Sequence, residues 1–137
     1  MNYLLDTNAV SEWVKPRPNP GLIRWMESAD EDRLYLSVIT LAELHYGVER
    51  MPAGSRRERL HRWLALELPE RFQGRVLGID EGVAVAWGKV VSTSESAGRP
   101  IGTMDAFLVA IAQVRACTLV TRNAAHFAMI TVLNPWI

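Results

Sequence analysis

Short apolar runs alternate with longer helical segments along the whole chain, and this alternation constrains the fold more than any other feature. The apolar runs are residues 3–5, 34–38, 76–79, 119–120 and 130–133. Strands that alternate with helices indicate parallel strands joined by right-handed crossovers. We therefore expect an α/β three-layer sandwich with a central parallel sheet of four to five strands.

The segments between these runs carry helical signals at their ends and in their apolar spacing. Expected helices cover residues 9–14, 21–29, 40–50, 55–68, 80–91 and 103–116, with polar residues 92–98 closing the fifth, and a turn or short helix covers residues 123–127. No repeat, low-complexity segment or linker interrupts this order. The sequence therefore predicts one domain over residues 1–137.

The composition excludes several classes of protein. The 137 residues carry no net charge, whereas proteins that hold nucleic acid by charge alone are strongly basic. The one cysteine, Cys117, permits neither an intramolecular disulfide nor a zinc site built from several cysteines. No apolar run is long enough to cross a bilayer, and the N-terminus does not resemble a signal peptide. We expect no membrane association and a cytoplasmic location.

Three apolar segments each contain a single charged residue. Asp6 is alone within residues 1–11, Glu43 within 34–48 (with His45 neutral) and Asp105 within 100–114. A carboxylate is costly to bury without a partner, and no Lys or Arg lies in any of the three segments. Clustered acids would repel one another unless a cation lay between them. Oxygen ligands favour a hard cation such as Mg²⁺ or Mn²⁺.

Each acid also has a purely structural interpretation, and these alternatives stay open at this point. Asp6 could cap the helix that begins near Ala9. Glu43 could reach back to the amide of Thr40 in a capping box. Asp105 lies in the first turn of a helix, where the helix dipole favours an acid.

Four motifs resemble those of the PIN-domain family, in order and at suitable spacing. The first is Leu4-Leu5-Asp6-Thr7-Asn8 and the second runs from Ser37 to Leu44. The third begins at Gly102-Thr103-Met104-Asp105-Ala106, and the fourth is Leu119-Val120-Thr121-Arg122-Asn123. The resemblance covers nearly the whole chain. Within the family, the length and motifs look most like the VapC and FitB toxins of type II toxin–antitoxin modules.

This resemblance implies a Mg²⁺- or Mn²⁺-dependent endoribonuclease that cleaves RNA with a metal-activated water. Asp6, Glu43 and Asp105 match the family's catalytic and metal-binding acids. The fourth acidic position falls at Asn123, which brings no charge and puts a second metal in doubt. The polar positions around the site match Thr7, Ser37 and Thr121, and Arg122 is the candidate for contact with an RNA phosphate.

The resemblance also implies partners: a cognate antitoxin that covers the active site, an RNA substrate and a second copy of the toxin in a homodimer, within a larger toxin–antitoxin complex. Trp13 is a candidate for lining the antitoxin groove. The alternative is a PIN-like module that binds RNA or protein with weak or no catalysis.

One stretch of the chain is locally basic. Residues 50–75 contain seven arginines and three glutamates. The planar guanidinium group suits phosphate, so this stretch could steer RNA. Because arginines and glutamates are mixed there, a solvated helix face is the stronger interpretation.

Overall fold

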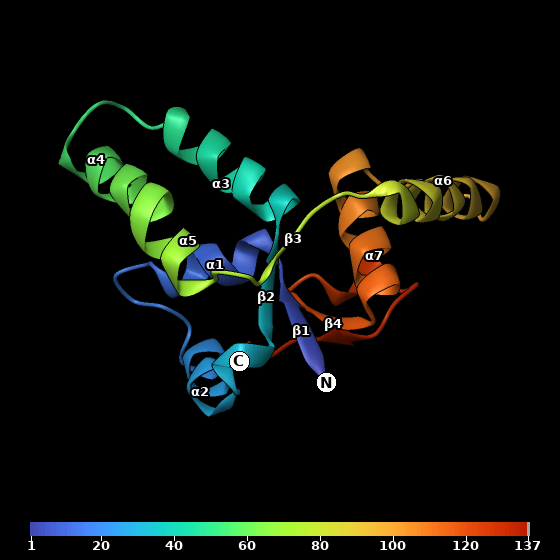
Figure 1. Cartoon of the computed structure of the whole chain (residues 1–137), viewed down its shortest axis with the longest axis horizontal. Helices are drawn as coiled ribbons and strands as arrows, with labels where there is room; N and C mark the ends of the chain where they lie inside the picture. The colour runs from blue at the N-terminus through green and yellow to red at the C-terminus, as the bar shows by residue number, and fades with distance from the viewer. Residues whose placement is uncertain (137) are drawn as a thin grey trace.

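Five parallel strands form one sheet in the order β3-β2-β1-β4-β5 (Figure 1). The computed structural model describes residues 1–136. Its strands are β1 (Asn2–Leu5), β2 (Leu34–Ser37), β3 (Val76–Leu77), β4 (Cys117–Val120) and β5 (Val132–Leu133). The predicted parallel sheet is confirmed with all five strands. The predicted β2 is one residue too long, because Val38 is already the first residue of a helix.

Helices and short helical turns connect these strands. They are α1 (Thr7–Trp13), α2 (Pro20–Ser28), η1 (Glu31–Arg33), α3 (Val38–Glu49), α4 (Ser55–Arg62), the π-helical η2 (Trp63–Glu67), α5 (Leu68–Arg71), α6 (Glu81–Ser96), α7 (Thr103–Arg115) and η3 (Ala124–Phe127). The prediction that residues 92–98 close the fifth helix is wrong in part, because α6 continues to Ser96. Ser94 is buried there and its hydroxyl points to the sulfur of Met129.

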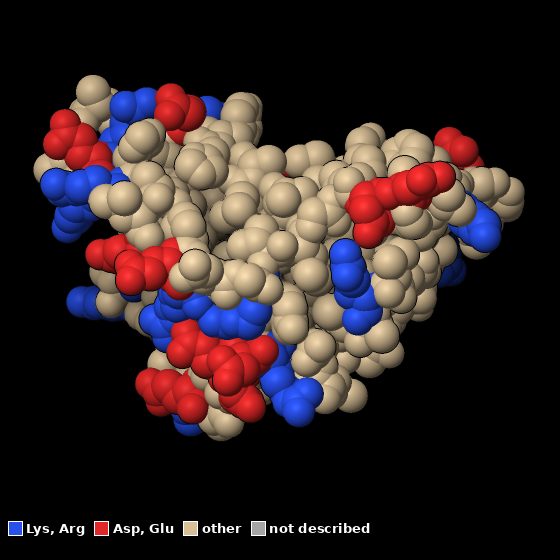
Figure 2. Space-filling model, viewed as in Figure 1, with Lys and Arg blue, Asp and Glu red and all other residues tan. Residues whose placement is uncertain are grey.

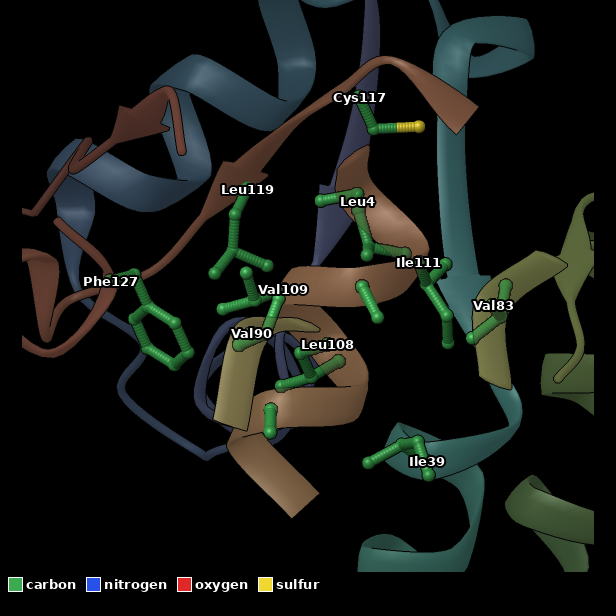
Figure 3. Close-up of a cluster of buried hydrophobic side chains, with 13 residues drawn as sticks. Leu4, Ile39, Val83, Val90, Leu108, Val109, Ile111, Cys117, Leu119 and Phe127 are labelled. Carbon is green, nitrogen blue, oxygen red and sulfur yellow. The ribbon is translucent and has the colours of Figure 1, made fainter. Parts of the chain in front are cut away.

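Alternate residues of β1 point to opposite faces of the sheet, as the pleat requires. Leu4 enters a core with Leu119 of β4 and with Val109 and Ile111 of α7, on the face that α6 and α7 cover. Figure 3 shows these side chains pointing toward one another around α7. Leu5 enters the other core, with residues of α1, α2 and α5. Burying both faces gives the predicted three layers, which are confirmed.

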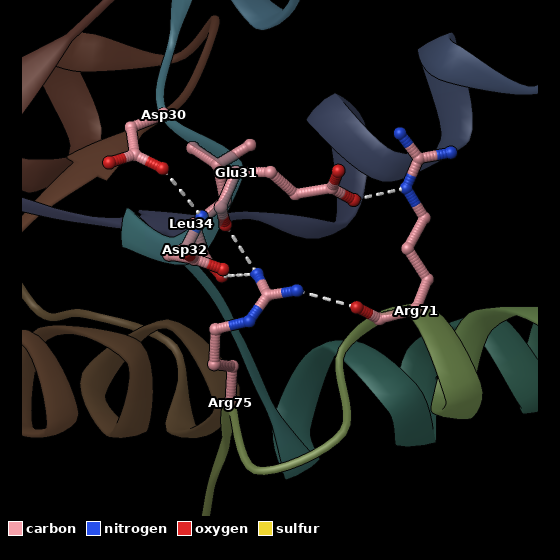
Figure 4. Close-up of polar contacts among 6 residues, drawn as sticks. All are labelled: Asp30, Glu31, Asp32, Leu34, Arg71 and Arg75. Carbon is pink, nitrogen blue, oxygen red and sulfur yellow. Dashed lines mark hydrogen bonds and ion pairs between the residues drawn. The ribbon is translucent and has the colours of Figure 1, made fainter.

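An arginine just after α5 links this part of the chain to the sheet. The Arg75 guanidinium donates to the backbone carbonyls of Glu31, Leu34 and Arg71, and the neighbouring Arg71 pairs with the Glu31 carboxylate (Figure 4). These bonds link the segment before β3 to the start of β2. They hold the two strands in parallel register at this end of the sheet.

Within residues 1–136, none of the helices is both long enough and apolar enough to cross a bilayer.

Candidate active site

The candidate site lies at the edge of the sheet where β2, β1 and β4 end. These three strands are neighbours and parallel, so their carboxyl ends meet at one edge. The chain goes from β1 to β2 and β3 on one side, then crosses to β4 and β5 on the other. Ligand sites of open α/β sheets form where the strand order reverses in this way. Asp6 and Thr121, which follow β1 and β4, flank this point.

Asp6 is held in place by the backbone and by a hydroxyl. Its backbone N–H donates to the carbonyl of Val120, and one carboxylate oxygen accepts from the N–H of Ala9 at 2.8 Å. The Thr121 side chain also hydrogen-bonds to this carboxylate. The interpretation of Asp6 as a helix cap is therefore correct. It does not exclude a role in the site, because a carboxylate has more than one lone pair to offer.

Glu43 comes from the second turn of α3 and meets the start of α1. The hydroxyl of Thr7 donates to a carboxylate oxygen of Glu43 at 2.5 Å. Thr7 directly follows Asp6, so this bond holds the second acid beside the first. The structure thus joins Thr7 and Glu43, which are 36 positions apart in the chain.

Asp105 comes from the first turn of α7, as predicted. Asp6 is only 4% exposed, and this burial is the largest cause of its raised pKa. The carboxylates of Glu43 and Asp105 raise the pKa of Asp6 further. Within residues 1–136, none of the three acids forms an ion pair with Lys, Arg or His. The fold has therefore gathered negative charge that the chain itself does not neutralise.

Ser37, rather than Thr40, caps α3. The backbone N–H of Thr40 donates to the Ser37 hydroxyl at 3.1 Å, and the helix begins at Val38. The capping-box interpretation of Thr40 and Glu43 is therefore wrong, and Glu43 is free to face Thr7. Thr40 supports the site from inside α3, whereas the sequence pattern predicts it at the start of this helix. It is fully buried, and its hydroxyl donates to the carbonyl of Leu5, directly before Asp6. The Ser-x-x-Thr spacing after a strand is the signal that could have found this pair.

The remaining predicted residues line the turn after β4. The buried Thr121 hydroxyl accepts from the N–H of Asn123 at 3.1 Å while also bonding to Asp6. Asn123 is exposed, and its side chain makes no capping bond to η3. Arg122 is exposed between them. Thr121 therefore lies in the site, and Arg122 and Asn123 follow it in the chain with exposed side chains.

The donor chemistry of this site fits a hard divalent cation. Its available groups are carboxylate and hydroxyl oxygens, and burial, together with the nearby carboxylates of Glu43 and Asp105, raises the pKa of Asp6. Across residues 1–136, however, no three Asp, Glu, His or Cys side chains are arranged so that all could hold one metal ion. A cation here would have fewer direct protein ligands and more water, as is common for Mg²⁺. The metal assignment of Asp6, Glu43 and Asp105 stays a prediction.

Comparison with known proteins identifies the family. The sequence profile described as "PIN domain" matches residues 3–131. The chain belongs to the PIN domain family. The relatives of this PIN domain protein include "Toxin FitB" of Neisseria gonorrhoeae, which is 36% identical over 97% of each chain. They also include "Ribonuclease VapC1" of Haemophilus influenzae, 36% identical over 98% of this chain and 96% of the relative. The family prediction is confirmed.

A solved structure has the same fold over nearly its whole length. It is described as FitAcB from Neisseria gonorrhoeae and superposes with a TM-score of 0.92 at 36% identity, covering 98% of each chain. The PIN domain protein therefore shares its fold with this structure. The predicted PIN-like fold is confirmed.

The structure places two further side chains, Trp13 and His45, and only the interpretation of His45 is wrong. Trp13 packs edge-on against Phe72, and the Arg71 guanidinium lies 4.3 Å from its ring centroid. Its half-buried ring therefore packs against the core next to α5, and its place in an antitoxin groove stays a prediction. His45, which the spacing of Leu41, Leu44 and Val48 predicts to be packed, is exposed.

Proposed function

We propose that this PIN domain protein is an endoribonuclease that acts as the toxin of a toxin–antitoxin pair and depends on Mg²⁺ or Mn²⁺. The observation that carries the proposal is that Asp6, Glu43 and Asp105 meet at the switch point of the sheet, and that within residues 1–136 none of them pairs with a cationic side chain. The names of the relatives, a toxin and a ribonuclease, support the same activity.

The chain's own residues prepare the site by fixing its oxygens. The N–H of Ala9 and the Thr121 side chain hold the Asp6 carboxylate, and the Thr7 hydroxyl holds that of Glu43. Fixed donors and acceptors reduce the reorganisation that the reaction would otherwise require. The exposed Arg122, which follows Thr121 in the chain, is the proposed contact for a phosphate oxygen of the substrate through its planar group.

Asp6 and Asp105 are the proposed direct ligands of the cation, and Glu43 is a ligand that acts through a water molecule. When bound, the cation would supply a Lewis acid that activates water and stabilises charge on the phosphate. The raised pKa of Asp6 fits this role, because a nearby positive charge would restore the ionised form of its carboxylate.

The test is cleavage of a fluorescent single-stranded RNA by the purified chain in Mg²⁺, in Mn²⁺ and in EDTA. We expect cleavage with either metal, none in EDTA, and a loss of about a hundredfold or more in Asp6→Asn, because this change removes a negative charge that holds the cation. Asp32→Asn is the matched control, because Asp32 is an exposed acid outside the site.

Two outcomes would contradict the proposal. Equal cleavage by wild type and Asp6→Asn would remove the assigned role of this acid. Absence of cleavage of any RNA by wild type in Mg²⁺ and Mn²⁺ would favour the binding module without catalysis, which the neutral Asn123 at the fourth position also suits.

A nuclease that attacks the RNA of its own cell must be restrained, so we propose a protein antitoxin as its partner. Co-expression with the protein encoded next to this chain should suppress cleavage and give a complex that purifies intact. Mass measurement of that complex also tests the predicted homodimer.

A further inference from the structure

A groove of about 980 Å³ opens directly beside the candidate site. Its lining includes Thr7 and Glu43, the pair joined by the hydrogen bond described above. From there the groove continues along α1, α3 and the helical arm formed by α4 and η2. Any chain-like ligand that reaches the acids could therefore extend into this groove.

The seven arginines of residues 50–75 separate into two groups in the structure. Four of them take part in interactions within the fold: Arg50 stacks on the Tyr46 ring, Arg57 pairs with Glu49, and Arg71 and Arg75 bind Glu31 and neighbouring carbonyls. The other three, Arg56, Arg59 and Arg62, are exposed and line the groove. Within residues 1–136, these three have no ion pair.

The total charge of the arm does not reveal this arrangement. Figure 2 shows basic and acidic side chains side by side at the end of the molecule where α3 and α4 lie. The distinction lies in which arginines are already paired. The three unpaired ones are spaced three residues apart on α4, so they recur along one side and span about 9 Å of its axis. They can therefore meet successive phosphates rather than a single one.

The floor of the groove is apolar, whereas its rim carries the arginines. Leu44, Met51, Leu60 and Trp63 line it. Apolar and aromatic groups beside a row of cations suit a single strand, since bases pack against the apolar surface while the backbone meets the cations. A duplex keeps its bases stacked inside, so it could not use this floor.

We infer that this groove binds the single-stranded RNA that flanks the cleaved bond, with Arg56, Arg59 and Arg62 contacting its backbone phosphates. This inference rests on the proposed function, because it names the substrate path that leads to the same acids. It assigns the three arginines to substrate binding and gives them no part in the bond-breaking step.

The experiment compares wild type with Arg56→Gln/Arg59→Gln/Arg62→Gln in steady-state cleavage of a single-stranded oligonucleotide long enough to fill the groove. We expect KM to rise about tenfold or more while kcat changes little, because phosphate contacts supply binding. The dependence of log KM on log salt should weaken by about two units, since each single-strand phosphate contact contributes about 0.7. A dinucleotide substrate, which does not enter the groove, should show no change in KM.

The matched control is Arg24→Gln/Arg33→Gln/Arg99→Gln, which removes the same charge from exposed arginines outside the groove. Circular dichroism melting of both variants establishes that they fold. An equal rise in KM in the control would overturn the inference in favour of general electrostatics. An unchanged KM in the groove variant would also overturn it, and loss of antitoxin binding in that variant would then assign the groove to the protein partner.

Binding measured separately distinguishes this inference from the proposed function. Fluorescence anisotropy of the same oligonucleotide in EDTA reports binding without cleavage. Binding that needs the three arginines, in a protein that cleaves no RNA with metal, would refute the proposed activity and support the groove assignment. Cleavage by wild type, with neither KM nor the binding affinity depending on the three arginines, would support the proposed activity and refute the groove assignment.

Discussion

The Thr7 hydroxyl donates a 2.5 Å hydrogen bond to the Glu43 carboxylate and so joins the first residue of α1 to the second turn of α3. Thr7 follows Asp6 in the chain, and Asp6 in turn bonds to Thr121 after β4. Two threonine hydroxyls therefore connect three segments that are distant in sequence. They determine how closely the acids of the site approach one another.

Removal of the Thr7 hydroxyl should release Glu43. We expect Thr7→Val to lower kcat/KM for RNA cleavage by roughly ten- to a hundredfold, the effect of losing a hydrogen bond to a charged group, about 1.5–3 kcal/mol. Thr7→Ser keeps the hydroxyl and should keep most of the activity. Steady-state cleavage of the same RNA by both variants measures this, and an equal loss in Thr7→Ser would contradict it.

Asp6 should make the stability of the metal-free protein depend on pH. Its pKa in the folded chain is raised above the ordinary value of 3.8, so the folded chain binds this proton more tightly than the unfolded chain does. The contribution of Asp6 to the free energy of unfolding is therefore most favourable below pH 3.8 and is lost as the pH rises through the raised pKa.

Asp6→Asn keeps the cap on α1 and removes this pH dependence. In EDTA we expect its melting temperature to exceed that of wild type by a few degrees at neutral pH, with the difference shrinking toward zero in acid. Thermal unfolding across a pH series measures this. Asp32→Asn, an exposed control, should show no such trend. A variant that is less stable than wild type at neutral pH would contradict the prediction.

Asn123→Asp should strengthen binding of a divalent cation. The N–H of Asn123 bonds to Thr121, and the change adds a negative charge at the fourth acidic position of the family. We expect the Kd for Mn²⁺ to fall about tenfold, which corresponds to roughly 1.4 kcal/mol. Isothermal titration calorimetry measures this, with Asn123→Ala as the control. Equal affinities in the two variants would place Asn123 outside the cation's reach.

Arg75 should matter for stability and not for catalysis. Its guanidinium donates to three backbone carbonyls, and Lys cannot reproduce this planar fork. We expect Arg75→Lys to lower the free energy of unfolding by about 1–3 kcal/mol, since carbonyls lose their partners. Urea unfolding measures the change, and Arg24→Lys is the exposed control. A loss of kcat in the folded variant would contradict the structural role.

Local sequence patterns predict the layers of this fold and identify its acids. Apolar runs such as residues 3–5 and 34–38 have the length typical of buried strands between helices, although Val38 already belongs to α3. A lone acid in an apolar segment is conspicuous because burial without a partner is costly. The sequence predicts the ends of the helices less accurately than the layers. Local signals at Thr40 and Ser92 were overridden by the Ser37 cap and by the packing of Ser94.

Which side chains meet depends on the packing of segments that are distant in the chain. The bond from Thr7 to Glu43 and the bond from Asp6 to Thr121 depend on three strands ending at one edge, which local sequence patterns do not specify. The same holds for the arginines of residues 50–75, which look alike in sequence. Whether an arginine is paired or faces the groove depends on what the fold places within reach of its long side chain.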